Sequence, residues 1–136
     1  MSLAANDGFA LQLHVEGELE STYSDMAAMA EKSGLQKDRL IRHYSPPNVE
    51  AKITQGLTPS VLAGKGALAT LLATAEQCSH GFMLETDYMD DLRRPGAVLG
   101  PKTVPKRTNQ LLNAGIDEEL LWRAHVDLPN ELYGQE

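Results

Sequence analysis

The sequence predicts an α/β protein built on a parallel β-sheet. Four short apolar segments recur along the chain, at residues 9–15, 39–44, 57–63 and 81–86. Segments whose apolar residues have helical spacing separate them, and this alternation favours βα units that share one parallel sheet. The run Phe82-Met83-Leu84 is apolar at every position, which is typical of a strand buried on both faces of such a sheet.

The first βα unit has clear boundaries. The strand at residues 9–15 lies between Gly8 and Gly17, and a helix follows at residues 19–32. Gly34 is a natural C-terminal stop for that helix. The spacing of four apolar side chains predicts its buried face, which consists of Leu19, Tyr23, Met26 and Ala30.

The next elements follow the same rhythm. The strand at residues 39–44 ends at Ser45-Pro46-Pro47, because prolines cannot continue a strand ladder. Residues 49–55 predict one or two helical turns before the third strand. A helix at residues 66–77 then leads to the fourth strand, with Leu68, Leu71, Leu72 and Ala75 facing inward.

The pattern changes after the fourth strand. Residues 88–100 predict a long charged loop, and Pro101 or Pro105 can occupy the first turn of a helix that runs to about residue 113. Gly115 ends that helix. Asp117 is expected to cap a last helix, which Pro129 should break before residues 132–134 pack onto the body.

Composition limits the classes of function. A chain of 136 residues suits one domain, and its net charge of −7 opposes broad binding to nucleic acid. A local basic strip is the one candidate for phosphate contacts, although such runs are usually solvated loops; it consists of Arg93, Arg94, Lys102, Lys106 and Arg107.

The number of cysteines and the length of the apolar runs predict the compartment and the absence of membrane contact. A single cysteine, Cys78, excludes an internal disulfide and fits a reducing cytoplasm. It lies in an apolar helical stretch, so burial is expected rather than nucleophilic chemistry. No apolar run approaches the roughly 20 residues of a membrane span, and the first eight residues do not resemble a signal peptide. We therefore expect a cytoplasmic protein with no membrane contact.

Three predicted strands end in side chains that bind metals. His14 and His43 lie at the ends of the first two strands, and Asp87 follows the fourth. The carboxyl ends of parallel strands meet at one edge of a sheet, so these side chains should converge on one cleft. Two imidazoles and a carboxylate suit Zn²⁺, Mn²⁺ or Mg²⁺. Such an ion polarises an ester and activates water, and Asp87 can also accept the water's proton.

Each of these residues has a simpler interpretation on its own. A lone histidine in a core is more often a hydrogen-bonded structural residue, and Asp87 could be a helix cap or an ion-pair partner. The conjunction of three strand ends is what favours a metal site. His80 and His125 lie in a connection and within a helix, and we expect them to be bystanders.

The motifs from residue 11 to residue 133 resemble the second half of the TatD-like metal-dependent hydrolases, within the amidohydrolase-type barrels, and their archaeal branch matches best. The most specific run is Phe82-Met83-Leu84-Glu85-Thr86-Asp87-Tyr88, which continues through Asp90-Asp91 and Arg93-Arg94-Pro95-Gly96 to Val104-Pro105. The other matching pieces are Gln12-Leu13-His14-Val15-Glu16, Arg42-His43-Tyr44-Ser45-Pro46-Pro47 and Gly56-Leu57-Thr58-Pro59-Ser60-Val61.

The resemblance implies a fold and a ligand set. That family has a (β/α)8 TIM barrel, and the chain would be one partial domain, residues 1–136, carrying strands five to eight. His14 looks like the strand-five histidine ligand, His43 like the strand-six histidine and Asp87 like the strand-eight aspartate. The family's His-x-His pair and strand-four carboxylate have no counterpart here. The resemblance thus implies two open sheet edges, one uncovered face and a missing N-terminal half.

The function implied is metal-dependent hydrolysis of an ester, with a DNA phosphodiester as the expected substrate, while a small phosphoester or an amide-type substrate stays open. Side chains beside the strand ends would line the substrate cleft or only pack the loops, namely Glu16, Tyr44, Ser60 and Tyr88. A homodimer or a complementing N-terminal half would complete the fold. The alternative is a non-catalytic fragment or assembly subunit that lacks the first-half ligands.

Overall fold

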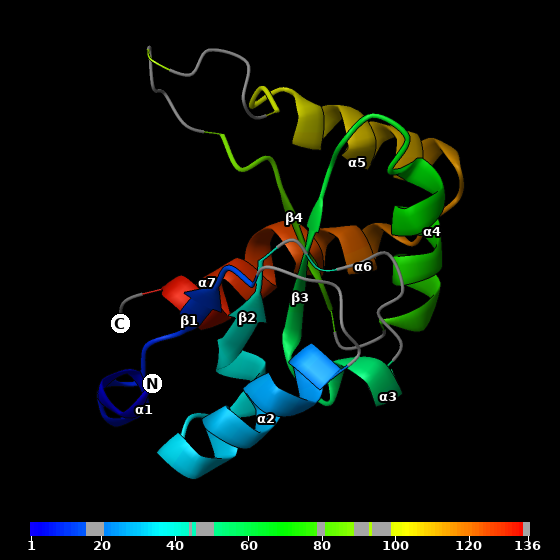
Figure 1. Ribbon diagram of the computed structural model, residues 1–136. Helices are drawn as coiled ribbons and strands as arrows, with labels where there is room; N and C mark the ends of the chain where they lie inside the picture. Colours follow the sequence, from blue (N-terminus) through cyan, green and yellow to red (C-terminus); the bar gives the residue numbers. More distant parts are fainter. Residues whose placement is uncertain are drawn as a thin grey trace.

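The computed structural model describes residues 1–15, 21–43, 45, 51–78, 81–88, 93 and 99–134. Within them, four parallel strands form one sheet in the order β1-β2-β3-β4. This confirms the predicted parallel sheet and its order (Figure 1). The strands are β1 Leu11–Leu13, β2 Leu40–Arg42, β3 Thr58–Leu62 and β4 Met83–Glu85.

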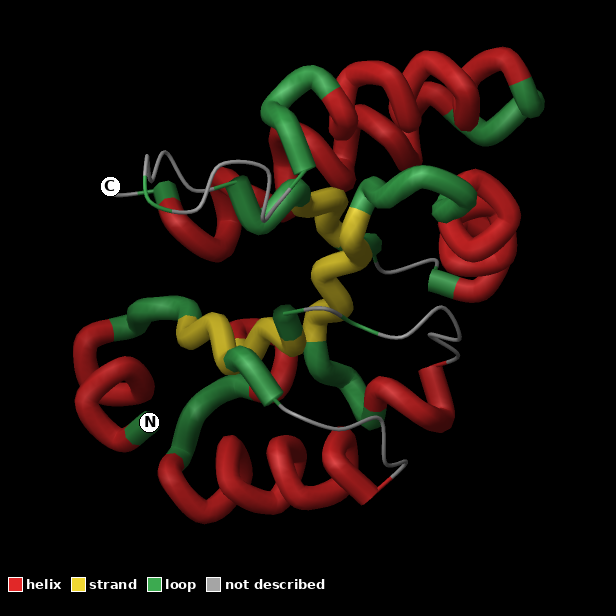
Figure 2. The backbone as a smooth tube through the Cα atoms, turned by 45° about the horizontal axis from the view of Figure 1, so that its top comes forward, coloured by secondary structure: helices red, strands yellow, loops and turns green. Residues whose placement is uncertain are grey.

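The strands are shorter than the apolar segments predict. Pairing nevertheless continues past their ends, because the N–H of His43 donates to the carbonyl of Leu13 at 3.1 Å and that of Ala63 to the carbonyl of Glu85 at 2.9 Å. Figure 2 shows the row of strands with the N-terminal helices at one end and the helices around α5 at the other.

The helices fall close to the predicted segments. Before the C-terminal region they are α1 Ser2–Asp7, α2 Ser21–Ser33, the 3-10 turn η1 Lys37–Arg39, α3 Ala51–Thr54, α4 Leu68–Gln77 and α5 Thr103–Asn113. Gly34 follows α2 with a φ of 75° and Gly115 lies just after α5 with a φ of 87°, so both predicted stops are confirmed. Pro105 lies in the first turn of α5, where its missing N–H costs no helical hydrogen bond.

Side chains alternate between two faces of the sheet, as the strand geometry requires. Leu40 packs with Tyr23 and Met26 of α2, and we call this the outer face. Arg42 points the same way, with its guanidinium carbon 4.5 Å from the centre of the Tyr23 ring, a cation–π contact. Ile41 lies between them in sequence and therefore belongs to the opposite, inner face.

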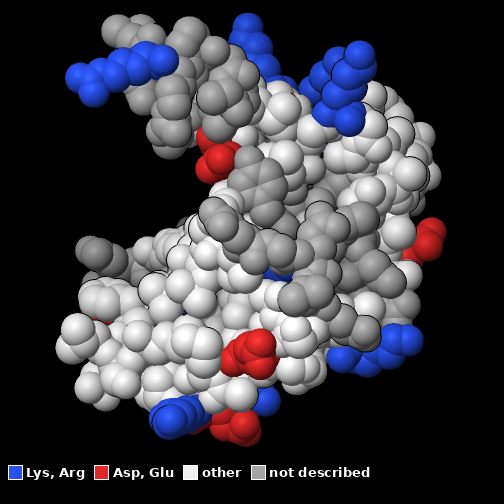
Figure 3. All heavy atoms as spheres, in the orientation of Figure 1, with Lys and Arg blue, Asp and Glu red and all other residues white. Residues whose placement is uncertain are grey.

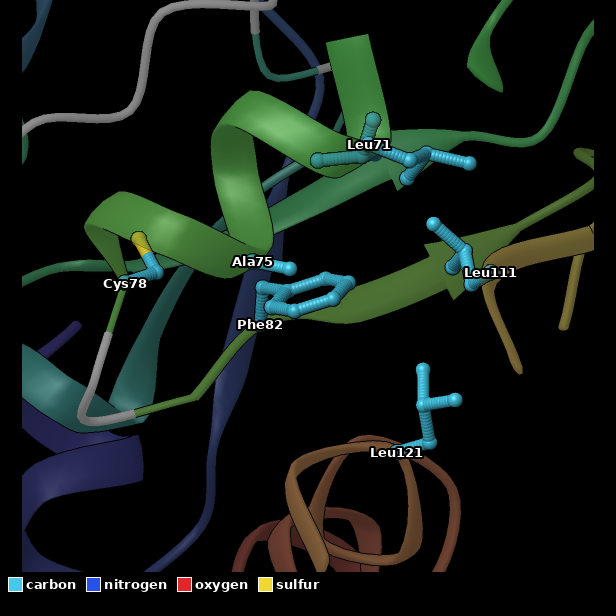
Figure 4. Packing of buried hydrophobic residues seen from close by; sticks show 7 residues of the cluster. Leu71, Ala75, Cys78, Phe82, Leu111 and Leu121 are labelled. Carbon is cyan, nitrogen blue, oxygen red and sulfur yellow. The ribbon is translucent and has the colours of Figure 1, made fainter. Parts of the chain in front are cut away.

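A second outer cluster joins α4 and α5 to β3 and β4. Phe82 and Leu111 are fully buried, and Figure 4 shows them between α4, β4 and α5, with Leu121 of the following helix nearby. Cys78 is also fully buried in this cluster, and burial raises its pKa to about 11. The expected burial of Cys78 is thus confirmed, and a thiol with that pKa carries almost no thiolate at neutral pH.

The C-terminal helix covers the inner face near the amino ends of the strands. This helix consists of α6 Glu118–Trp122, the π-helical turn η2 Arg123–Asp127 and α7 Leu128–Tyr133. Leu128 and Leu132 pack against Ile41 and Met83. The expectation of a wholly uncovered face is therefore wrong for these residues, because α7 shields the inner face near the amino ends of the strands.

Gly81 allows the C-terminal helix to pack closely against the start of β4. Its φ is +115°, and a Cβ there would lie 3.2 Å from Arg123 Nε and 3.3 Å from a methyl carbon of Leu128. A glycine at the entrance to β4 thus admits both the backbone conformation and the near approach of the helix. Arg123 also holds Glu131 in a bidentate ion pair at 2.9 and 3.0 Å, which ties η2 to α7.

The prediction that Pro129 breaks the last helix is wrong. The chain stays helical from Glu118 to Tyr133, and Pro129 falls in the first turn of α7 directly after the π turn. The hydrogen-bond pattern changes there from five-residue to four-residue spacing, so a residue without an N–H is tolerated at that point. The predicted cap is confirmed, because Asp117 Oδ1 accepts from the N–H of Glu119 at 2.9 Å.

Candidate metal centre

The three predicted ligands lie together at the carboxyl edge of the sheet. His14 and His43 directly follow β1 and β2, and their ring centres are 5.4 Å apart. Asp87 lies two residues beyond β4, with its Oδ1 3.4 Å from His43 Nε2. The parallel register brings these strand ends to one edge, as the sequence predicts.

Asp87 has an unusual backbone. Its φ is +51°, in the left-handed region where residues other than glycine are uncommon and Asp and Asn are enriched. Two contacts hold the adjoining Thr86: its carbonyl accepts from the N–H of Leu99 at 3.3 Å and its Oγ1 from the N–H of Tyr88 at 3.2 Å. The side chain of Asp87 is 36% exposed, so its carboxylate remains accessible to water.

Glu85 belongs to the same cluster, although sequence reasoning assigned it no role. Its Oε2 lies 2.8 Å from His43 Nδ1 and 2.5 Å from Ser60 Oγ, and both His43 and Glu85 side chains are 12% exposed. The signal that could have found it is spacing, because Glu85 precedes Asp87 by two residues along an extended segment. Gln12 precedes His14 in the same way, and its Nε2 lies 3.4 Å from Glu85 Oε2.

The predicted substrate-contacting residues have different outcomes. Ser60 is buried, and its hydroxyl donates to Glu85 rather than facing an open cleft. Tyr88 is half-exposed beside Asp87. Glu16 and Tyr44 lie outside the described residues, as does His80. His125 of η2 contacts Thr108 Oγ1 at 2.9 Å, far along the chain from the cluster, and burial lowers its pKa.

Pairwise geometry in the cluster suits a shared ion. Two ligand atoms on a tetrahedral zinc with bonds of about 2.0–2.1 Å lie about 3.3 Å apart, which is close to the separation of His43 Nε2 and Asp87 Oδ1. Two imidazoles on one such ion have ring centres about 5 Å apart, close to the His14–His43 separation. The donor types and these separations fit a divalent ion.

The full set is not gathered around one point. Within the part of the chain that the structure describes, no three His, Cys, Asp or Glu side chains are arranged to hold a metal ion as they stand. His43 is instead held between two carboxylates, Glu85 and Asp87. For three of the described side chains to hold an ion together, at least one of them would have to rotate.

Comparison with known proteins gives the family. A model described as TatD related DNase matches residues 1–134. The chain belongs to this family. Members of the TatD family are metal-dependent hydrolases, so the chemistry that the strand ends suggest and the family assignment agree. No helix among the described residues is long and apolar enough to cross a membrane.

One relative is the uncharacterized protein MJ1127 of Methanocaldococcus jannaschii. It is 34% identical over 134 residues, which cover 98% of this chain and 46% of the relative. The chain thus spans about half the length of the curated relative that it matches. No solved structure gives a significant match.

Tyr133 gives a prediction about pH. Its hydroxyl donates to Gln12 Oε1 at 3.4 Å, and burial first and the charge of Glu85 second raise its pKa above the ordinary 10.0. The unfolded chain ionises this phenol at lower pH than the folded chain does. The stability that Tyr133 contributes is therefore complete below about pH 10 and is lost as pH rises through the folded pKa.

Tyr133→Phe removes this linkage. We expect its melting temperature to fall less than that of the unmodified chain between about pH 9 and about pH 11, because no phenol at this position can ionise. Equal falls in calorimetric scans of both proteins would contradict the assigned pKa direction.

Proposed function

We propose that this chain carries half of the metal centre of a TatD-type hydrolase that cleaves phosphodiesters, with DNA as the substrate. The observation that carries the proposal is the meeting of His14, His43 and Asp87 at one edge of a parallel sheet. In this account His14 and His43 each supply a ring nitrogen and Asp87 supplies a carboxylate oxygen.

A divalent ion held by these residues supplies Lewis acidity toward a phosphoester oxygen and lowers the pKa of water at the site. The side chains of this chain would hold the ion and accept protons. Asp87 is the more exposed of the two carboxylates in the described cluster, at 36% against 12% for Glu85, so it can accept a proton from attacking water. Zn²⁺, Mn²⁺ and Mg²⁺ are the candidate ions, and the two imidazole nitrogens favour Zn²⁺ among them.

A basic margin near the site favours a phosphate-bearing substrate despite the net charge of −7. Figure 3 shows Lys and Arg atoms along the upper margin of the molecule and Asp and Glu atoms in the hollow below it. Lys65, Lys102 and Lys106 are all exposed. They come from the loop after β3 and from the start of α5, and Arg107 Nε joins these two segments by donating to the carbonyl of Gly64 at 2.9 Å.

Neighbouring side chains would complete the substrate cleft. Tyr88 offers a half-exposed aromatic ring next to Asp87, on which a base can stack. We assign Glu16 and Tyr44 to the same cleft from their positions next to His14 and His43 in the sequence. The structure favours a supporting role for Ser60, since its hydroxyl is already used by Glu85.

We further propose that the four strands are the second half of an eight-stranded barrel, completed by a second copy of the chain or by a complementing N-terminal half. The match covers 46% of the relative, and β1 and β4 are the two edges of the described sheet. A groove of about 390 Å³ at the start of β1 is lined by Asp7, Gly8, Phe9, Ala10, Leu132, Tyr133 and Gly134. Phe9 is 58% exposed and Tyr133 50% exposed, so two aromatic side chains are partly exposed beside the edge strand of the described sheet. In the purified chain a second copy is the expected occupant.

Asp87→Asn tests the metal assignment. The neutral amide is a poor ligand, so we expect the affinity for Zn²⁺ or Mn²⁺ measured by calorimetry to fall about 100-fold or more. Metal-dependent hydrolysis of a small phosphodiester should fall with it, while the mass in solution stays the same. Asp25→Asn, on the exposed face of α2, is the matched control. Unchanged metal affinity in Asp87→Asn would exclude this carboxylate as a ligand.

Charge removal at the basic margin tests the substrate. Lys102→Gln/Lys106→Gln should weaken binding of a single-stranded oligonucleotide and lower the slope of log affinity against log salt by about 1–2, because up to two phosphate contacts are lost. The charge-matched control is Lys32→Gln/Lys52→Gln. Equal effects of both double variants would show that net charge alone governs the binding.

A charge at the β1 edge tests the assembly. We expect light scattering to report dimers or larger species for the purified chain, because apolar edge surface is costly in water. Phe9→Lys should shift this population toward monomer. Trp122→Lys, at a residue that is 60% exposed on α6, should not. A stable monomer before any substitution would overturn the assembly proposal.

A further inference from the structure

Arg107 of α5 is a buried cation whose hydrogen bonds go to uncharged acceptors. The residue is only 7% exposed, with Nε donating to the carbonyl of Gly64 at 2.9 Å and Nη1 to Gln110 Oε1 at 2.7 Å. Within the part of the chain that the structure describes, its Nη2 makes no hydrogen bond and no carboxylate pairs with the guanidinium. A buried charge without a counter-ion is costly, so this arrangement favours an anion as the missing partner.

The start of α5 carries the opposite charge pattern to the one that stabilises a helix. Its first turn contains no acidic residue, and the side chain of Lys102 makes no capping hydrogen bond. Lys106 follows Lys102 at the i,i+4 spacing, where like charges repel each other. Positive side chains at a helix N-terminus also oppose the helix dipole. This pattern lowers the stability of the helix, and departures of this kind are expected at functional sites.

The buried guanidinium and the start of α5 belong to one region at the carboxyl edge of the sheet. Long side chains in a helix lean toward its N-terminus, which directs Arg107 toward the first turn of α5. Gly64, its acceptor, comes two residues after β3, and the N–H of Ala63 donates to the carbonyl of Glu85 at the end of β4. Figure 3 shows Lys and Arg atoms on the margin where Figure 1 draws α5.

We propose that Arg107 and the first turn of α5 form a phosphate subsite. Arg107 donates from Nη2 to a phosphate oxygen, a charge-assisted bond that guanidinium groups form well. Lys102 and Lys106 add positive charge, and the positive end of the α5 dipole adds to their field. The ligand is a phosphate group, carried by a DNA strand or free in solution. Where it concerns DNA, this inference rests on the proposed function.

Titration of the metal-free chain with inorganic phosphate, followed by amide NMR, tests the subsite. We expect saturable shifts of the amide signals at the start of α5 and none in α2. Arg107→Gln should weaken phosphate binding about 10-fold or more, because a charge-assisted bond is lost. Lys102→Gln/Lys106→Gln should also weaken it, and these side chains are exposed, so the core is not disturbed.

The control for this titration is Lys32→Gln/Lys52→Gln, which removes the same charge from exposed positions elsewhere and should leave phosphate binding unchanged. Melting curves by circular dichroism show that each variant is folded. Shifts that are absent or lie away from α5 would overturn the proposal. Phosphate affinity that Lys102→Gln/Lys106→Gln leaves unchanged would do so as well, whether or not Arg107→Gln folds.

Lys102→Glu separates a binding role from a structural one. The new carboxylate favours the positive end of the helix dipole and pairs with Lys106 at the i,i+4 spacing. We therefore expect the melting temperature to rise while phosphate affinity falls about 10-fold or more. If Lys102 served only the fold, phosphate affinity would not change, and that result would contradict the subsite.

Competition identifies the source of the phosphate. Inorganic phosphate should displace a single-stranded oligonucleotide from the metal-free chain more strongly than sodium chloride at the same ionic strength, and Arg107→Gln should weaken binding of both ligands. If Arg107→Gln loses phosphate but binds the oligonucleotide as before, the subsite stands with free phosphate as its ligand and the proposed DNA substrate fails. If Arg107→Gln is folded and binds both ligands as the unmodified chain does, the subsite proposal is overturned.

Discussion

The register of the parallel sheet is the constraint on which the candidate site depends. Leu13 pairs with Arg42 and Ser60 with Met83, so the residues that follow β1 and β2 emerge near the end of β4. Side chains alternate in direction along each strand, and this alternation sends His43, Ser60 and Glu85 to one face. A one-residue slip of β2 would turn His43 to the outer face and bring Arg42 into the cleft. The packing of Leu40 and Arg42 against α2 opposes that slip.

The two ends of the inner face have different chemistry. Near the amino ends of the strands, Ile41 and Met83 pack against Leu128 and Leu132. Near the carboxyl ends, the same face carries the polar cluster of Gln12, His43 and Glu85. Tyr133 links the two, because it ends α7 and its hydroxyl reaches Gln12. Apolar packing at one end thus supports a polar site at the other, as is usual for folds with parallel strands.

Local sequence signals predicted most of the fold. Apolar runs gave the four strands, and glycines placed the ends of α2 and α5, because a positive φ is a local property of the chain. The C-terminal helix was predicted less well. A proline normally ends a helix, but Pro129 directly follows a π-helical turn. The helix also packs closely against Gly81, and this contact depends on the tertiary structure. Such contacts cannot be predicted from a short segment of sequence.

Part of the arrangement of the candidate site could also be predicted. The meeting of His14, His43 and Asp87 at one edge of the sheet was predictable, because residues at strand ends are visible in a linear sequence; their role as metal ligands stays a prediction. Glu85 was harder to assign, since its role depends on which neighbours reach its Oε2 oxygen. Its partners Ser60 and His43 lie 25 and 42 residues away along the chain. Contacts over such separations follow from the register of the sheet rather than from local pattern.

X-ray absorption at the zinc edge of the metal-loaded chain tests the central claim most directly. The account predicts a low-coordinate zinc with two imidazole nitrogens and a carboxylate oxygen at about 2.0–2.2 Å, and the loss of one imidazole in His43→Ala. A spectrum without imidazole scattering, or one that His43→Ala leaves unchanged, would contradict a metal centre at this edge of the sheet.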